Sequence, residues 1–195
     1  MDHWVAVQAA TDYEPVPKGP IPAGAVPDPP GFRACVAYLR RGGATHEAPA
    51  VPRTNEELVT ECETNYKTLR NHVLGILISF KWWEAEAKAL GIRADEQKVA
   101  TEFTRFRKEQ YGSVVKYQNY LRRTKQTLAD SYLRMRIDLL TLGLSKHFLS
   151  QGKAAFVRYM QQFPKEWAAK TVCQPQDLVP NCKKYKGSTA PEARI

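Results

Sequence analysis

Proline is missing from the long middle of this 195-residue chain. All 13 prolines lie either between Pro15 and Pro52 or from Pro164 onward. Proline lacks an amide hydrogen and fixes φ, so it interrupts helices and inner strands. The middle of the chain can therefore form long helices, whereas the proline-rich start cannot.

A long apolar run is also missing. The longest apolar stretch, residues 73–83, contains Lys81, and it falls well short of the roughly 20 residues that a membrane-spanning helix needs. The start of the chain, Met1-Asp2-His3-Trp4, lacks the basic and apolar regions of a signal peptide. With 43% hydrophobic and 25% charged residues, the composition excludes a multi-span membrane protein and a wholly disordered chain. We expect either a cytosolic protein or a chain without its original N-terminus.

Catalytic and metal-binding motifs are absent as well. The glycines form no phosphate-binding loop, and the four histidines are scattered, with no H-E-x-x-H pattern and no nucleophile elbow. The four cysteines have no C-x-x-C spacing. We therefore predict no catalytic residue, no metal site and no cofactor.

Positive charge is in excess. Lys and Arg number 29 against 20 Asp and Glu, a net charge of +9. The excess lies in the second half, because residues 101–136 carry 9 basic and 3 acidic groups. The plainest interpretation is a solvated outer face of helices. Attraction to acidic clients or to an anionic envelope surface is a second interpretation. No motif accompanies the charge, so we expect no specific nucleic-acid partner.

The strongest pattern predicts a helix over residues 54–90. Thr54 and Glu57 form a capping box, and Gly91 suits the position after the helix end. The apolar residues that follow the cap are spaced three and four apart, which places them on one face: Leu58, Cys62, Tyr66, Leu69, Val73, Ile76, Phe80, Trp83, Ala87 and Leu90.

Shorter elements surround this helix. A short helix (2–10) and a proline-rich extended strap (12–30) come first, followed by a helix (31–41) and a loop (42–53). Later helices are predicted over 95–112, 113–123, 127–149 and 153–170, the last of them kinked at Pro164. The fold class is all-α: a long scaffold helix, shorter helices packed across it and an N-terminal strap. We expect residues 171–195 to form a closed loop and then a disordered tail after Lys186.

The cysteines suggest two disulfides. Cys173 and Cys182 bracket a proline-containing loop, and a bond there would contribute roughly 2–3 kcal/mol. A Cys35–Cys62 bond would join the short helix at 31–41 to the long helix. Free thiols and a zinc site are the alternatives. Two disulfides would indicate an oxidising compartment.

Aromatic residues provide candidate binding positions. Trp82 departs from the apolar face that carries Trp83, and Tyr111, Tyr117 and Tyr120 cluster near Arg122 and Arg123. These rings either pack between helices or form an amphipathic cleft for extended apolar segments. With Met135, we take Trp82 and the three tyrosines as candidate client-binding residues.

Two segments resemble a known family. F-K-W-W-E-A-E-A-K-A-L-G-I-R-A-D-E-Q-K-V, from Phe80, and Y-L-R-R-T-K-Q-T-L-A-D-S-Y-L-R-M-R-I-D-L-L, from Tyr120, are similar to the N-terminal chaperone domain of SurA/PrsA-type foldases. Lys125 replaces the glycine that is usual in that pattern. The proline-rich start and the W-A-A-K-T-V-C segment resemble actinobacterial members with the same extra cysteines.

The resemblance implies an extracytoplasmic holdase that binds unfolded or nascent secreted proteins without catalysis. It also implies a chaperone domain over residues 54–170, with residues 1–53 and 171–195 as appendages, and a chain that begins inside the family's first segment. The parvulin isomerase domain of many relatives has no counterpart here, because only a few residues separate the last two helices. The alternatives are a prolyl isomerase, a helical nucleic-acid-binding module and a homodimerisation module.

Overall fold

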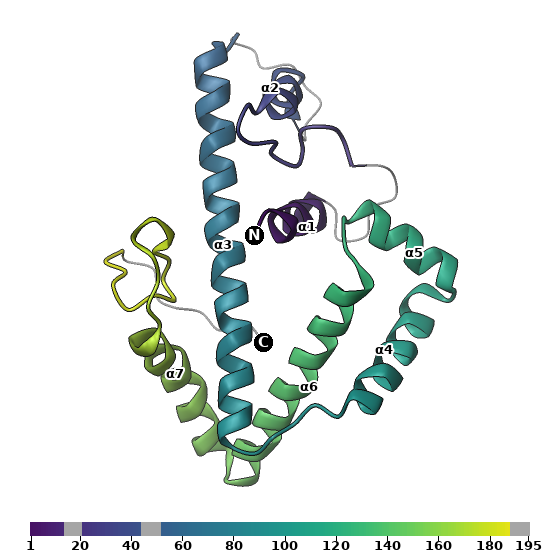
Figure 1. The fold of residues 1–195 in the computed structure, drawn as a ribbon, viewed down its shortest axis with the longest axis vertical. Coiled ribbons are helices and arrows are strands. Elements are labelled where there is room, and N and C mark those ends of the chain that lie inside the picture. Colours follow the sequence, from purple (N-terminus) through teal and green to yellow (C-terminus); the bar gives the residue numbers. More distant parts are fainter. Residues whose placement is uncertain (14–20, 44–51, 188–195) are drawn as a thin grey trace. The chain divides into compact units, whose positions relative to one another are not determined.

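Within the described residues, the chain forms seven α-helices (Figure 1). The computed structural model describes residues 1–13, 21–43 and 52–187, and within them it contains no strand. The helices are α1 (Asp2–Tyr13), α2 (Arg33–Arg40), α3 (Asn55–Ala89), α4 (Glu96–Tyr111), α5 (Val114–Arg123), α6 (Leu128–Ser150) and α7 (Lys153–Lys170), followed by a 3-10 turn, η2 (Pro175–Asp177). The prediction of an all-α fold with one long helix and shorter helices packed against it is confirmed.

The long helix α3 begins at the predicted capping box. The Thr54 amide donates to Glu57 Oε2 at 2.7 Å, and the Glu57 amide donates to Thr54 Oγ1 at 3.2 Å. These bonds satisfy amides that have no partner inside the helix. At about 1.5 Å per residue, the 35 residues of α3 span about 52 Å.

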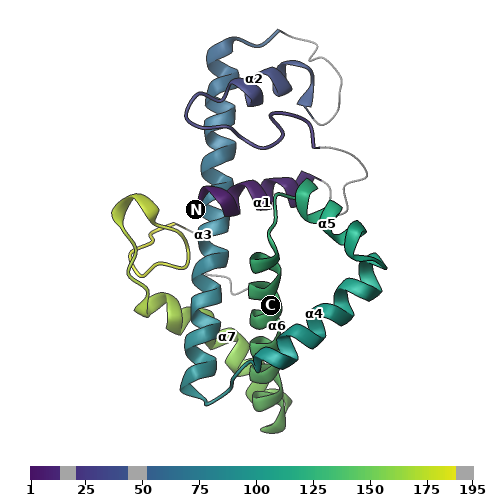
Figure 2. The same ribbon diagram turned by 45° about the vertical axis from the view of Figure 1, so that its right-hand side comes forward.

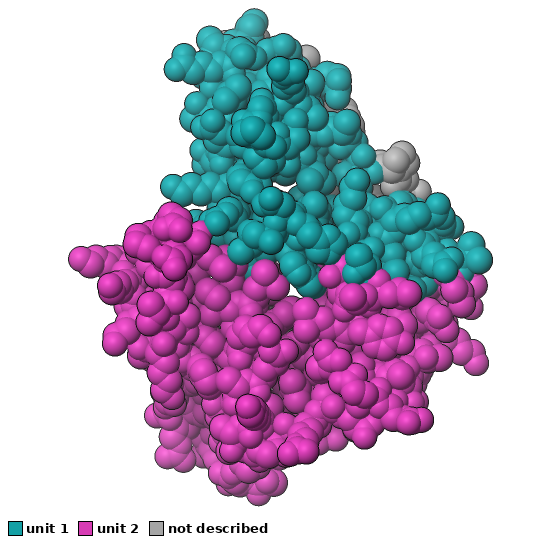
Figure 3. All heavy atoms as spheres, in the orientation of Figure 1, with its two compact units in different colours: residues 1–73, 115–127 teal, residues 74–114, 128–195 magenta. Residues whose placement is uncertain are grey.

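The chain divides into two compact units, coloured separately in Figure 3. Unit 1 comprises Met1–Val73 and Val115–Thr127, and unit 2 comprises Leu74–Val114 and Leu128–Ile195. The division passes through α3, so each unit contains part of that helix. Each unit is described by itself below.

Unit 1 is built around the Cys35–Cys62 disulfide. Phe32 and Val36 pack beside this bond against Leu58 of α3, and all three side chains are buried. The helix α2 is capped by a side chain from the preceding loop, because the Asp28 carboxylate accepts hydrogen bonds from the Ala34 and Cys35 amides, each at 2.9 Å. Of the strap predicted over residues 12–30, residues 12–13 belong to α1 and residues 21–30 contain turns. Residues 14–20 of the strap and most of the loop before α3 lie outside the described residues.

The helix α5 ends in a left-handed turn at Lys125. The φ of Lys125 is 60°, and the Gln126 amide donates to the Leu121 carbonyl at 2.9 Å. The Lys125 amide points to the Arg122 carbonyl at 3.5 Å. This pattern is a Schellman motif, which usually places glycine at the left-handed position.

The core of unit 2 joins α3, α6 and α7. Figures 1 and 2 both show α6 reaching a tight turn from which α7 doubles back. Phe163 of α7 stacks on Trp83 of α3 with ring centres 4.0 Å apart, and Tyr159 stacks on Phe148 of α6 at 3.8 Å. Further buried residues of this core are Trp82, Ala87, Ile137, Leu140, Leu144 and Ala168.

The helix α4 packs on α6. Phe103 contacts Tyr132 with ring centres 4.5 Å apart, and Arg136 forms two hydrogen bonds to the Glu96 carboxylate. The helix α7 contains Pro164 and continues to Lys170, and the predicted kink stays a prediction. None of the described helices combines the length and hydropathy that crossing a bilayer requires.

Candidate functional site

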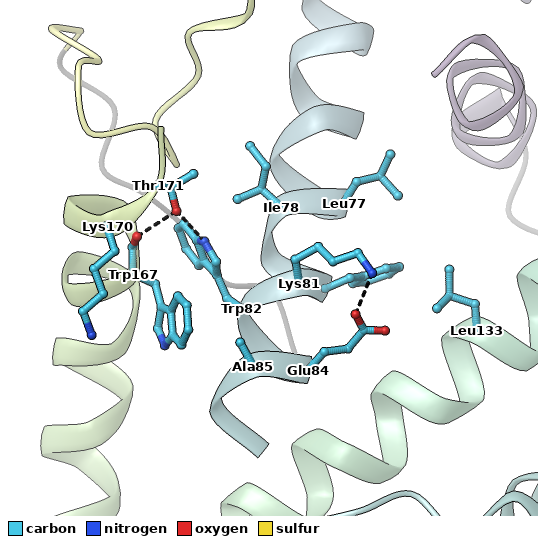
Figure 4. A pocket seen from close by; sticks show the side chains of 11 residues that line it. Leu77, Ile78, Lys81, Trp82, Glu84, Ala85, Leu133, Trp167, Lys170 and Thr171 are labelled. Carbon is cyan, nitrogen blue, oxygen red and sulfur yellow. Dashed lines mark hydrogen bonds and ion pairs between the residues drawn. The ribbon is translucent and has the colours of Figure 1, made fainter. Parts of the chain in front are cut away.

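Unit 2 contains a hollow of about 600 Å³ along α3, which we call the apolar groove. Figure 4 shows α3 in the middle, Trp167, Lys170 and Thr171 on one side, and Leu133 of α6 on the other. Almost all of the exposed surface in the groove is apolar. The lining residues are Leu77, Ile78, Phe80, Lys81, Trp82, Glu84, Ala85, Leu133, Trp167, Lys170 and Thr171.

Two tryptophans form one side of the apolar groove, and their polar atoms are already engaged. Trp82 Nε1 donates to Thr171 Oγ1 at 2.8 Å, and that hydroxyl donates to the Trp167 carbonyl at 2.8 Å. Trp167 Nε1 donates to Glu86 Oε2 at 2.9 Å. Because both indole donors are occupied, the half-buried Trp167 offers a ligand its apolar ring, and the buried Trp82 forms apolar wall behind it.

Charged groups lie at the edge of the apolar groove. Lys81 Nζ pairs with Glu84 Oε2 at 2.7 Å, and the two charges offset each other. Lys170 Nζ lies 5.2 Å from the centre of the Trp167 ring, a cation–π contact. The Lys170 side chain therefore brings a positive charge next to an apolar wall.

The C-terminal loop holds this edge in place. The Cys173–Cys182 disulfide closes the loop, and the Lys183 amide donates to the Thr171 carbonyl at 2.9 Å. Asn181 Nδ2 donates to Ser79 Oγ of α3 at 3.2 Å. Val179, which is 1% exposed, anchors the same loop. Thr171 and Lys183 are thereby fixed beside α3.

Trp82 is buried, with 2% of its surface exposed. Of the two alternatives that the sequence left open for this ring, the structure has the first, packing between helices. The reason is α7: Phe163 packs against Trp83 by stacking and against Trp82 by an edge contact at 6.3 Å. A returning helix thus covers both consecutive tryptophans. Trp82 nevertheless lines the apolar groove.

The other four candidate residues do not line the apolar groove. Tyr117 is 2% exposed, so its ring is packed inside unit 1. Tyr120 is half-buried, its hydroxyl accepts from Gln126 Nε2 at 3.2 Å, and both tyrosines belong to unit 1. Tyr111 and Met135 belong to unit 2 and are half-buried. Their role in client binding stays a prediction.

Most groove residues were not singled out from the sequence. Leu77, Leu133 and Trp167 come from three helices, and periodicity along one helix does not tell which neighbour it meets. A usable signal was present, because the departure of Trp82 from the apolar face indicates a second packing direction on α3.

Both predicted disulfides are present, and none of the four cysteines is free. The alternatives of free thiols and of a cysteine zinc site are therefore wrong. In the described ranges, no three His, Cys, Asp or Glu side chains come together as metal ligands would.

One half-buried ionisable group packs against the core of unit 2. Burial raises the pKa of the Tyr159 hydroxyl well above its usual value, and the nearby Glu86 charge adds to this rise. Tyr159 is therefore neutral at physiological pH and serves as an aromatic core residue against Phe148 and Phe163.

Comparison with known proteins gives no family for this chain. No family model matches it, and neither a curated protein nor a solved structure matches it significantly.

Proposed function

We propose that this protein is an extracytoplasmic holdase-type chaperone that binds unfolded or extended segments of secreted proteins in the apolar groove. The observation that carries the proposal is the groove itself. It joins leucine, isoleucine and phenylalanine side chains to two indole rings whose donors are occupied. Binding to such a surface is favourable because it removes the apolar side chains of a client from water, whatever the client's sequence.

The size and form of the apolar groove suit a chain segment. A hollow of about 600 Å³ accommodates several apolar side chains. The polar groups at its edge, Lys81 and Glu84, pair with each other. Binding would then depend on apolar area, as it must in a chaperone that accepts many clients.

The turn at Lys125 supports the resemblance to SurA/PrsA-type foldases. The family pattern has glycine there, and this backbone adopts the left-handed conformation that glycine takes without strain. The backbone at Lys125 therefore fits the glycine of the family pattern, although the residue itself differs.

The two disulfides support the proposed compartment. Disulfides persist in oxidising surroundings such as the cell envelope and the extracellular space. The Cys35–Cys62 bond lies within unit 1 and the Cys173–Cys182 bond within unit 2. The second bond holds the edge of the apolar groove. Secretion to the envelope accounts for both.

The test is suppression of aggregation of a reduced, unfolded test protein, followed by light scattering. We expect the wild type to suppress scattering at stoichiometric excess. Leu77→Gln should weaken suppression several-fold, because it places an amide in the groove without removing a side chain of the buried core.

The matched control is Leu142→Gln. Leu142 lies on α6, is 47% exposed and does not line the apolar groove. Equal loss in both variants would assign suppression to general surface hydrophobicity. No suppression by the wild type, or catalysis by it in a proline-limited peptide assay, would contradict the proposal.

A further inference from the structure

One end of the apolar groove lies beside a basic segment of the chain. Lys170 lines the apolar groove, and the amide of Lys183 is bonded to Thr171, another lining residue. Lys184 and Lys186 follow directly. From residue 153 to residue 187 the chain has 7 basic residues and only 2 acidic ones, Glu166 and Asp177.

Two acidic side chains at the apolar groove already have partners. Glu84 is paired with Lys81, and Glu86 accepts from Trp167. Lys170, in contrast, rests on the Trp167 ring, which leaves its ammonium group able to meet a carboxylate from outside. The Lys170 ammonium and the Trp167 ring therefore present a positive charge and an apolar face next to each other.

This arrangement has a fixed geometry. The Cys173–Cys182 bond and the Asn181–Ser79 hydrogen bond hold the loop against α3. The backbone of Lys183 is therefore held next to Thr171, and the Lys170 ammonium lies against the Trp167 ring of the apolar wall. A ligand with an apolar part and an adjacent negative charge would meet both surfaces at once.

We propose that the apolar groove selects unfolded segments in which carboxylates flank the apolar side chains, with the carboxylates at the Lys170 and Lys183 end. This inference rests on the proposed chaperone function and specifies which clients it takes. Segments with lysine or arginine beside the apolar side chains are disfavoured, because like charges repel at that end.

The test uses three fluorescently labelled peptides with one leucine- and phenylalanine-rich centre and flanks of aspartate, serine or lysine. Binding to the full chain is measured by fluorescence anisotropy. We expect the affinity order aspartate, serine, lysine, with about a fivefold step at low ionic strength, because exposed ion pairs contribute little individually. The steps should shrink as salt is added.

Charge reversal at the groove gives the decisive variant. Lys170→Glu with Lys183→Glu should invert the order of the aspartate and lysine peptides, whereas Lys170→Gln with Lys183→Gln should abolish the preference. Both side chains are exposed, so the fold should persist, and thermal unfolding checks this. The control, Lys146→Glu with Lys153→Glu, makes the same change in net charge at exposed positions that do not line the apolar groove.

The outcomes separate this inference from the proposed function. Failure of all three peptides to bind would contradict the chaperone function itself. Equal binding of the three would overturn only the selectivity, as would an equal effect of the control, which would assign the preference to net charge. Displacement of the aspartate peptide by phosphatidylglycerol vesicles but not by phosphatidylcholine vesicles, lost on reversal at Lys170 and Lys183, would make the basic end a lipid-facing surface and overturn the inference.

Discussion

At the residue scale, Lys125 has a left-handed backbone conformation that suits glycine better than lysine. Its φ of 60° is unfavourable for a residue with a Cβ atom, yet the Schellman motif of α5 requires it. The strain is local, because it arises between the side chain and its own backbone.

Lys125→Gly should therefore stabilise unit 1. We expect a gain of about 0.5–1 kcal/mol, since glycine removes the steric cost but adds freedom to the unfolded chain. Thermal unfolding measures the change as a higher Tm. The control is Gln118→Gly in the middle of α5, which should lower stability by about 1 kcal/mol. A lower Tm for Lys125→Gly would show that the lysine side chain contributes more than the strain costs.

The capping box at Thr54 makes a prediction about protonation. The hydrogen bond from the Thr54 amide, and then that from its hydroxyl, lower the pKa of Glu57 below 4.5. Because the folded pKa is depressed, the stabilisation is present above pH 4.5 and disappears as the pH falls through the depressed value. NMR titration of the Glu57 carboxyl should show this directly.

Thr54→Ala should move the pKa of Glu57 part of the way back toward 4.5, since the backbone bond remains. Thr60→Ala, further along α3, should leave the pKa of Glu57 unchanged. If the two variants have the same effect, the hydroxyl of Thr54 does not contribute to the cap.

At the element scale, the positions of the helices in the sequence were predictable, but which helices pack against one another was not. Caps such as Thr54 and Asp95 and the spacing of apolar residues act within one helix, so the sequence indicated where helices begin and end. Which helix covers a given face depends on packing between distant segments. Trp82 is the clear case, because Phe163 covers it from a helix 80 residues later in the chain.

The apolar groove was unpredictable for the same reason. It needs α3, α6, α7 and the disulfide loop in one place. The disulfide pairs were predictable, since only a few pairings of four cysteines are possible and the two late cysteines are close in sequence.

The two disulfides should differ in their effect on stability. Cys35 and Cys62 are 27 residues apart, whereas Cys173 and Cys182 are 9 apart. In the loop-entropy account, removing the first costs about 3.6 kcal/mol and removing the second about 2.7 kcal/mol. Denaturant unfolding of Cys35→Ser/Cys62→Ser and Cys173→Ser/Cys182→Ser measures both.

The effect of the two disulfides on client binding should have the opposite order to their effect on stability. Loss of Cys173–Cys182 frees the loop that positions Thr171 and Lys183, so it should weaken client binding several-fold. Loss of Cys35–Cys62 affects unit 1 and should leave client binding nearly unchanged at temperatures where the variant is folded. Equal binding by the wild type and Cys173→Ser/Cys182→Ser would show that the loop has no part in the site.

At the scale of the whole molecule, the charge and the apolar surface point to the same activity. In the proposed function, the net charge of +9 would attract acidic chains over long distances, and the apolar groove would then remove their apolar side chains from water. The first interaction weakens with salt and the second does not, so binding should decline with salt to a plateau rather than to zero.

Site-specific photocrosslinking tests the central claim most directly. A benzophenone amino acid replaces Leu77 in the apolar groove or, as the control, exposed Leu142 of α6. The protein is then irradiated with a reduced, unfolded test protein or with its folded form. We predict strong crosslinks from position 77 to the unfolded form, few to the folded form and few from position 142. Equal crosslinking from both positions, or none from position 77, would contradict the assignment of client binding to the apolar groove.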